Sequence, residues 1–511
     1  MLRAARSLLR LLRIAIILAR HDALFLLEKL DVAPVVVLAA RLVSYRRRTG
    51  RPGQRLARAL QEAGPSFIKV GQALSTRADL LGEEMASDLS ELQDHLPPFP
   101  AAQARKVIET EFDQPVEALF KSFDDTPVAA ASIAQVHLAV TADGREVAVK
   151  ILRPGIETAF TRDIDLFFWG AELVEMTQPR LRRLKPVESV RTLAESVHLE
   201  MDLRYEAAAA AELRENFEGD PNFHVPAVDW PRTGRRVMTI ERVSGIPIDD
   251  REAILAAGHD PEEVLAKAGD AFFKQVFRDG FFHGDLHAGN LFVDKNGGIA
   301  VVDFGIMGRL DKPTRRHLGE LLVAFLHRDY RRAAEVHMEA GWIPRTSSVD
   351  AFTQACRSIA EPIMDKPQNE ISIGRLLGQL FRVAETFHME VQPQLLLLQK
   401  TMLVGEGTAR RLSPESNIWF LARPLVEEWI GGVMSPEGRI KEAAGNIAAA
   451  IERLPRLAEG LEHGIGRLAK GEVRLDPDSL QMLKTGGNGR MTVALLWAIL
   501  AVLTALLITA L

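Results

Sequence analysis

The stretch HGDLHAGNLFVDKNGGIAVVDFG, residues 283–305, decides the fold class of this 511-residue chain. Asp285 comes five positions before Asn290, and Asp303 opens a DFG triplet. Two short apolar runs lie between them, joined by DKNGG, whose Asn-Gly-Gly chemistry predicts a hairpin turn. Phosphoryl transfer needs oxygen ligands for Mg²⁺ and a carboxylate that orients the nucleophile and accepts its proton. This spacing matches a kinase catalytic loop, so we predict Asp285 as the catalytic residue and Asn290 and Asp303 as metal ligands.

A lysine at the end of a predicted strand supports the same interpretation. Residues 147–150 read VAVK, and Lys150 stands where a lysine that contacts the α- and β-phosphates of ATP is expected. The preceding run VAAASIAQVH contains no glycine, although a kinase has a glycine-rich loop there. We predict that ATP is bound by Lys150 and by the run Val128, Ala129, Ala130, Ala131, Ser132, Ile133, Ala134, Gln135 and Val136.

The absence of glycine changes what this loop can do. Backbone N–H groups can face phosphates without glycine, but Cβ atoms limit close approach and disfavour positive φ. We therefore expect the nucleotide to sit differently from its pose under a glycine-rich loop. The alternative is a tight strand turn built from small residues.

Two helical stretches carry charges that need partners. Residues 190–217 offer Glu195, Glu200 and Glu206 as candidate carboxylates for Lys150, and the pattern does not choose among them. A second helix, within residues 67–94, groups polar side chains on an otherwise apolar background: Lys69, Gly71, Gln72 and Arg77. A buried lysine there would require a carboxylate partner, whereas a plain surface helix is the alternative.

The order of elements predicts an α+β, bilobal, protein-kinase-like fold with an N-terminal helical extension and a C-terminal transmembrane helix. We expect ATP between the lobes, with adenine near the backbone of Glu241 to Val243. The predicted parts are a basic interfacial helix at 1–30, a helical extension at 31–122, an N-lobe at 123–245 with one long helix, a helical C-lobe with the hairpin at 246–430, a helical linker at 431–490 and a membrane span at 491–511.

Composition bounds the remaining possibilities. Apolar residues make up 47% and charged residues 26% of the chain, as in packed globular proteins. A net charge of −5 gives no pull toward nucleic acid, so we expect no nucleic-acid partner. Cys356 is the single cysteine, which excludes an internal structural disulfide and fits a reducing compartment.

Both ends of the chain suggest contact with membrane lipids. The first twenty residues contain five arginines and no acid, a pattern typical of an interfacial helix; a transit peptide and a plain surface helix are the alternatives. Residues 491–511 carry no charge and would span about 31 Å as a helix, against a hydrocarbon core of about 30 Å. We predict a tail anchor, with Lys484 and Arg490 favouring a cytoplasmic N-terminal side. A buried core helix is the alternative.

Taken together, the motifs resemble the UbiB family of atypical kinases. The resemblance rests on KVGQ at 69–72, AAASIAQVH at 129–137, VAVK at 147–150, EMDLRYE at 200–206, HGDLHAGN at 283–290 and DFG at 303–305. It implies that the extension lies across the active site, with Lys69 and Gln72 in its signature motif. It also implies that Lys69 pairs with Glu200 of a Glu-x-Asp motif ending at Asp202, and that Glu206 is the partner of Lys150.

The resemblance further implies a role in ubiquinone biosynthesis at the bacterial cell inner membrane, with the catalytic domain cytoplasmic. Other biosynthetic enzymes or ubiquinone precursors would then be partners. We expect an ATP-dependent kinase or ATPase that uses ATP and Mg²⁺. Relatives often end in two hydrophobic spans, whereas this tail has room for one.

Two other functions stay open at this point. HGDLHAGN lacks the arginine of HRD and resembles the loops of aminoglycoside and choline phosphotransferases, which favours a small-molecule or lipid acceptor. A nucleotide-gated scaffold for the biosynthetic enzymes is the non-catalytic alternative.

Overall fold

The computed structural model describes residues 2–25, 50–75, 82–90, 92, 97–177, 185–344, 346–362, 379, 383–384, 386–389 and 392–413. They all belong to one compact unit, Met1–Trp429. The predicted linker at 431–490 and the predicted span at 491–511 lie outside the described residues. In the part of the chain that is described, no helix has the length and apolar character needed to cross a membrane.

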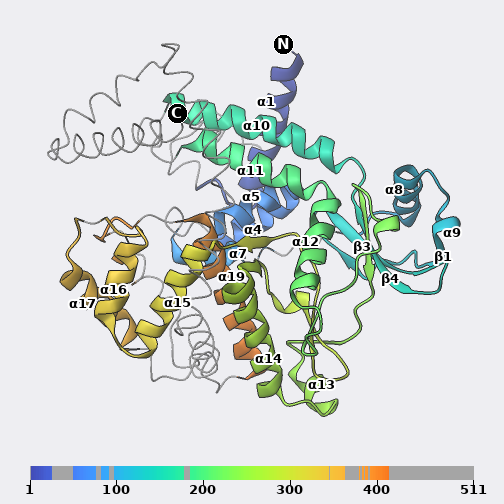
Figure 1. Cartoon of the computed structure of the whole chain (residues 1–511). Helices are drawn as coiled ribbons and strands as arrows, with labels where there is room; N and C mark the ends of the chain where they lie inside the picture. The colour runs from blue at the N-terminus through green and yellow to red at the C-terminus, as the bar shows by residue number, and fades with distance from the viewer. Residues whose placement is uncertain are drawn as a thin grey trace, which may run out of the picture. The chain divides into compact units, whose positions relative to one another are not determined.

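An antiparallel sheet forms the centre of the N-lobe (Figure 1). Its strands run in the order β1 (Phe120–Phe123), β3 (Ala134–Thr141), β4 (Glu146–Leu152) and β6 (Val237–Glu241), and β2 (Ala129–Ala130) pairs with β3. Strand β4 alternates because successive side chains point to opposite faces: Val147, Val149 and Ile151 are buried. They form one core with residues of α8 (Ala101–Phe112) and α9 (Val116–Leu119). The prediction of a strand ending near Lys150 is confirmed.

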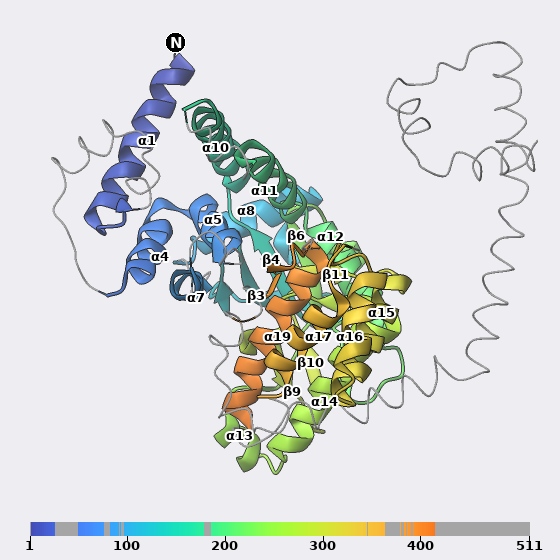
Figure 2. The same ribbon diagram turned by 90° about the vertical axis from the view of Figure 1, so that its left-hand side faces the viewer.

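The helical part of the N-lobe differs from the prediction of one long helix. The structure has α10 (Ile156–Thr177), α11 (Pro186–Glu200) and α12 (Leu203–Asn216), with α10 packed along α11 (Figures 1 and 2). The helical pattern at 190–217 breaks because the Asp202 side chain accepts a hydrogen bond from the Arg204 N–H and caps α12. The Leu203 N–H donates to the Arg235 carbonyl, 2.9 Å away, instead of continuing α11.

In the C-lobe, short strands surround the predicted catalytic residues. The DKNGG hairpin prediction is confirmed, because β9 (Leu291–Val293) pairs antiparallel with β10 (Ile299–Val301). These two strands lie between β5 (Phe223–His224) and β7 (Ile246–Pro247) in a four-stranded sheet. A separate pair joins β8 (Phe281–His283) to β11 (Met307–Arg309), so the segment before Asp285 runs beside the segment after the DFG triplet.

Helices make up the rest of the C-lobe. Their bounds are α13 (Arg251–Ala256), α14 (Pro261–Phe273), η3 (Lys274–Asp279, a π-helix), η4 (Ala288–Asn290), α15 (Lys312–Leu326), α16 (Tyr330–Glu339), α17 (Val349–Ala360) and α19 (Pro393–Leu412). Helices α15, α16 and α17 share a core of their own that includes Tyr330, Phe352 and Cys356. Helix α19 packs against α14 and β11 (Figure 2), which places it at the predicted catalytic loop.

The N-terminal extension forms a further cluster from α1 (Leu2–Arg20), α4 (Pro52–Ala63), α5 (Pro65–Ser75) and α7 (Glu83–Ser90). Arg10 donates to both carboxylate oxygens of Asp163 on α10, each at 3.1 Å, and its guanidinium lies 5.7 Å from the Phe67 ring centre. The Asp163 side chain is only 3% exposed. Arg10 therefore faces protein, unlike Arg13 and Arg20, which are exposed and fit the predicted basic surface.

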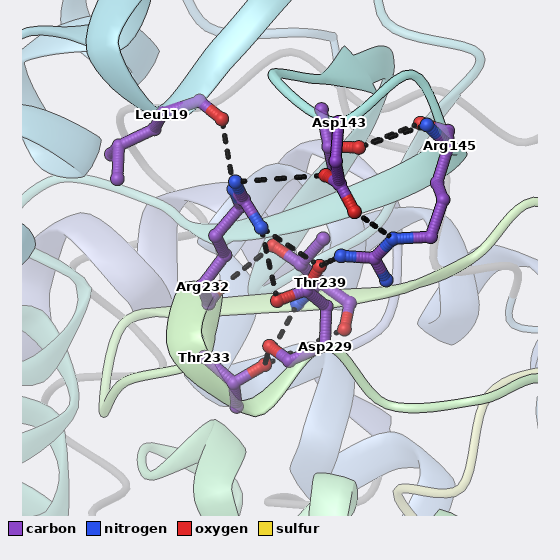
Figure 3. Close-up of polar contacts among 8 residues, drawn as sticks. Leu119, Asp143, Arg145, Asp229, Arg232, Thr233 and Thr239 are labelled. Atoms are coloured by element: carbon purple, nitrogen blue, oxygen red, sulfur yellow. Dashed lines mark hydrogen bonds and ion pairs between the residues drawn. The ribbon is translucent and has the colours of Figure 1, made fainter.

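A polar network fastens one edge of the N-lobe sheet (Figure 3). Asp229 is buried, and it accepts hydrogen bonds from Arg145 at 2.7 Å and from Arg232 at 3.0 Å. Arg232 also donates to the Leu119 carbonyl at 2.8 Å. One buried carboxylate thus joins the β3–β4 turn, the end of α9 and the segment before β6. This network therefore restrains the turn after which β4, the strand that carries Lys150, begins.

Replacing Arg10 with methionine should destabilise the protein, because it leaves the buried Asp163 carboxylate without its bidentate partner. We expect a loss of about 3 kcal/mol in the free energy of unfolding, measured by urea denaturation in mild detergent. Arg162→Met is the matched control, since Arg162 is 61% exposed and its Nε lies 3.5 Å from Asp163. Equal, small losses of about 0.5 kcal/mol in both variants would contradict the structural role of Arg10.

Candidate active site

A buried histidine joins the loop of Asp285 to the DFG triplet. His283 is fully buried, and its Nδ1 accepts the Asp285 N–H at 3.1 Å. Its Nε2 lies 2.6 Å from the Asp303 carbonyl. Since a carbonyl only accepts, Nε2 carries the proton, and burial lowers the pKa of His283 further in favour of this neutral form. Asp285 and Asp303 are therefore held in a fixed relation by one imidazole ring.

The predicted metal ligands, Asn290 and Asp303, each have a side-chain oxygen atom that a cation could contact. The Asn290 side-chain N–H donates to the Asp285 carbonyl at 3.0 Å, which orients the amide and leaves its Oδ1 for a cation. Asp303 has a φ of 64°, a left-handed conformation that is uncommon for residues other than glycine, although aspartate adopts it more readily than most. Among the described residues, no group of three or more His, Cys, Asp and Glu side chains could hold a metal by itself. An amide and a carboxylate still fit Mg²⁺, which usually completes its shell with phosphate and water oxygens.

Lys150 lies between two carboxylates. Its Nζ is 2.6 Å from Glu206 Oε1 on α12 and 3.1 Å from Asp303 Oδ1. The pair with Glu206 predicted from the family resemblance is therefore present, and Glu195 and Glu200 are not the partners in this structure. Burial alone would lower the pKa of Lys150, but the charges of Asp303 and Glu206 hold it above its ordinary value.

The two carboxylates respond to this lysine in opposite ways. The nearby Lys150 charge lowers the pKa of Asp303, so this carboxylate stays ionised and able to bind a cation. Burial raises the pKa of Glu206 to about 7 despite the attraction of Lys150, and the negative charge of Asp303 adds to the increase. Glu206 is the member of this triad whose charge changes near neutral pH.

The alanine-rich run forms a tight β-hairpin. Strand β2 pairs with β3, the Val128 N–H donates to the Val136 carbonyl at 2.9 Å, and the Ala131 N–H donates to the Ala134 carbonyl at 2.8 Å. A hairpin of this kind fits both the predicted phosphate loop and its alternative, a tight strand turn built from small residues. Ser132 is fully buried in the turn, and its Oγ finds no hydrogen-bond partner within the described ranges. Binding of ATP beneath the hairpin stays a prediction.

The hairpin is tied down from the side of the extension. Arg153 donates to the Ala131 carbonyl at 2.9 Å and to the Pro97 carbonyl at 3.0 Å. Gln135 is fully buried and exchanges hydrogen bonds with the backbone N–H and carbonyl of Phe99. Val136 pairs directly with Lys150 and shares its face of the sheet, so the alternation along β3 turns the neighbouring Gln135 side chain away from that face.

The signature residues of the extension are also placed. Lys69 Nζ on α5 lies 2.7 Å from Glu200 Oε2 at the end of α11, and both side chains are mostly buried. The predicted pairing is therefore present, although its regulatory role stays a prediction. Asp202 caps α12 and pairs with Arg204 at 2.6 Å. Gln72 is half-buried on α5, and its carbonyl accepts the Ser75 hydroxyl at 2.7 Å.

Lys400 is a site residue that sequence reasoning missed. Its Nζ lies 3.1 Å from Asp285 Oδ1, across 115 positions of the chain. The available signal was a single lysine inside the apolar run LLLLQKTMLV of α19, the same kind of signal that drew attention to Lys69. His287 is the other basic group near this carboxylate, with Nε2 4.0 Å from Asp285 Oδ2.

The bilobal arrangement, the Lys150–Glu206 pair and the linked Asp285 and Asp303 segments define an atypical protein-kinase-like domain. Comparison with known families agrees, because residues 91–337 match the ABC1 atypical kinase-like domain and residues 356–417 match the UbiB helical domain. The chain belongs to the UbiB family.

Relatives from several bacteria support this membership. A Marinobacter nauticus protein described as "Probable protein kinase UbiB" is 44% identical over 80% of this chain and 75% of its own length. A Pseudomonas aeruginosa protein with the same description is 40% identical over 92% of this chain and 89% of its own length. Among solved structures, the complex of Rv3197 with erythromycin from Mycobacterium tuberculosis is similar with a TM-score of 0.50 and 26% identity, over 72% of this chain and 93% of that one.

The raised pKa of Glu206 predicts a pH-dependent site. Its ordinary value is 4.5, and the folded protein raises it to about 7, so Glu206 is protonated below that pH and loses its charge-paired hold on Lys150. We expect affinity for MgATP to fall as the pH drops below about 7, by at most about tenfold per unit.

The measurement is a titration of MgATP binding between pH 6 and 8. Glu206→Gln is the control, because its amide does not titrate; it should bind MgATP more weakly and with a flat profile. A flat profile in the wild type would contradict the prediction.

Proposed function

We propose that this chain is an ATP-dependent kinase or ATPase that supports ubiquinone biosynthesis at the bacterial inner membrane. The observation that carries the proposal is the triad in which Lys150 joins Glu206 to Asp303, with Asp285 and Asn290 fixed beside it. A lysine held in this way can contact ATP phosphates, and the remaining carboxylate can act on a nucleophile. The description of the relatives, "Probable protein kinase UbiB", agrees with this activity.

The chemistry balances without a further reactant. The oxygen of water or of an acceptor hydroxyl attacks the γ-phosphorus of ATP, the bond to the β,γ-bridging oxygen breaks, and ADP leaves with that electron pair. Asp285 orients the attacking oxygen and accepts its proton. Mg²⁺ held by Asn290 Oδ1 and the Asp303 carboxylate would neutralise phosphate charge. Lys150 orients the α- and β-phosphates, and Glu206 keeps the lysine side chain in that position.

The family resemblance implies that the extension lies across the active site, and such a position favours a small or lipid-like acceptor, or water, over a protein chain. Lys69 anchors α5 to Glu200, which lies six positions before Glu206. The same ion pair therefore restrains the segment that carries the partner of Lys150. A domain anchored by the apolar residues 491–511 would meet membrane lipids and precursors that leave the bilayer. A nucleotide-gated scaffold is the outcome of the test in which nucleotide binds but no phosphate is released or transferred.

Asp285→Asn should retain MgATP binding and lose turnover by about 10²-fold or more, because the amide cannot accept the proton. Lys150→Ala should weaken MgATP binding itself. The experiment incubates purified full-length protein with γ-labelled ATP and a membrane extract, and it follows label in free phosphate, lipid and protein.

Asp350→Asn is the matched control, since Asp350 is 85% exposed on α17, and it should behave as the wild type. Wild-type turnover in Asp285→Asn would refute the proposed catalysis. Label in a protein band other than the chain itself would identify a protein acceptor instead.

Lys69→Ala should change nucleotide handling without removing a catalytic group, because it frees the end of α11 and loosens Glu206. We expect a change of several-fold in basal ATP turnover and an increase in autophosphorylation, both measured with and without anionic liposomes. Lys185→Ala is the control: it breaks an exposed ion pair of 2.9 Å with Glu188 on the same helix α11. If both variants behave alike, the extension does not restrain the site.

A further inference from the structure

We propose that Lys400, on helix α19 within the part of the chain that matches the UbiB helical domain, completes the active site by orienting Asp285 and contacting the γ-phosphoryl group of ATP. The inference rests on the proposed function, because it adds a residue to the same site. The motifs of the kinase-like domain assign no function to the UbiB helical domain at residues 356–417, and this inference gives it one.

The position of Lys400 is fixed by its own helix. Leu398 is buried, and Thr401 is buried with its hydroxyl donating to the Leu397 carbonyl at 2.9 Å. The polar end of Lys400 lies opposite Asp285, with the two side chains 31% and 29% exposed. A pair at this depth is screened less than a surface pair and still reaches the solvent from which a substrate arrives.

Gly284 provides the room for this approach. A Cβ at this position would lie 3.0 Å from both terminal carbons of Leu397 and 2.9 Å from Ile306 Cγ2. Protein kinases have an arginine in the HRD triplet where this chain has Gly284. Here the missing side chain lets α19 pack directly on the loop, and the same helix supplies a positive charge three residues after Leu397.

The other lysine of the site has different partners. Lys150 contacts Glu206 and Asp303, so its charge compensates those two carboxylates rather than Asp285. Lys400 contacts Oδ1 of Asp285, whereas Oδ2 of the same carboxylate is the atom nearest His287. An ammonium group has three N–H donors, so Lys400 can keep its bond to Oδ1 and donate another to a phosphoryl oxygen. Oδ2 then receives the proton of the attacking oxygen.

If Lys400 contacts the γ-phosphoryl group, its loss should affect the affinities for MgATP and MgADP differently. ATP carries that group and ADP does not, so loss of Lys400 should weaken MgATP and spare MgADP. A merely structural lysine would affect both nucleotides equally. The contribution of Lys400 is the stabilisation of negative charge on the transferred group.

The test compares Lys400→Met and Lys400→Gln with the wild type in the full-length protein. We expect kcat for ATP turnover to fall by about 10²-fold. Affinity for MgATP should fall by about tenfold, while affinity for MgADP stays within about twofold of the wild type. Lys400→Arg keeps the charge and should retain more activity than either neutral variant. Thermal unfolding of each variant shows whether the fold is intact.

Arg411→Met is the matched control on the same helix, because it removes an exposed pair with Asp249 at 3.6 Å without approaching the site. It should leave turnover unchanged. Turnover of folded Lys400→Met or Lys400→Gln within about threefold of the wild type, or equal weakening of MgATP and MgADP, would overturn the inference.

A double variant separates this inference from the proposed function. Lys400→Met added to Asp285→Asn should lower turnover little further, because residues that act as a unit are not additive. An active Lys400→Met beside an inactive Asp285→Asn would refute the role of Lys400 alone. An active Asp285→Asn would refute the proposed function itself.

Discussion

The contact between Lys150, Glu206 and Asp303 ties together three segments that are far apart in the chain. Strand β4 supplies the lysine, α12 supplies one carboxylate, and the DFG triplet supplies the other. A buried lysine without a counter-charge would be costly, and each carboxylate would be costly alone. The N-lobe sheet, the break between α11 and α12, and the left-handed turn at Asp303 are therefore all arranged so that these charges meet.

The interior of the site was predictable from sequence because its spacing is local. Asp285 and Asn290 are five residues apart, and the hairpin before Asp303 follows from Asn-Gly-Gly turn chemistry. The capped break at Asp202 was not recognised, because alanine, leucine and glutamate favour helix on both sides of it. Helix α10 was also missed, although Ile156, Phe160 and Phe167 follow a helical spacing.

Some of the long-range contacts could also be expected from the sequence, and others could not. Pairs between residues that a recognised motif names, such as Lys69 with Glu200, could be expected from the family resemblance. The pair of Lys400 with Asp285 could not, because nothing in the local pattern of α19 indicates which carboxylate it meets. The hydrogen bonds of Arg153 and Gln135 to the backbone of residues 97–99 were missed for the same reason, since backbone partners leave no mark in a sequence. These bonds help the loop without glycine to keep one shape, because they restrain the backbone of the hairpin.

The distance along the chain between Asp285 and Lys400 has a consequence during synthesis. The two residues are 115 positions apart, so at ordinary elongation rates the ribosome adds the lysine ~6–23 s after the aspartate. The kinase-like domain can therefore leave the exit tunnel and begin to fold while the carboxylate still lacks its counter-charge. Closing so long a loop is also entropically costly, which makes the docking of α19 a late event. A nascent chain holding nucleotide in that interval would be poorly equipped to turn it over, so the order of translation itself delays the onset of activity.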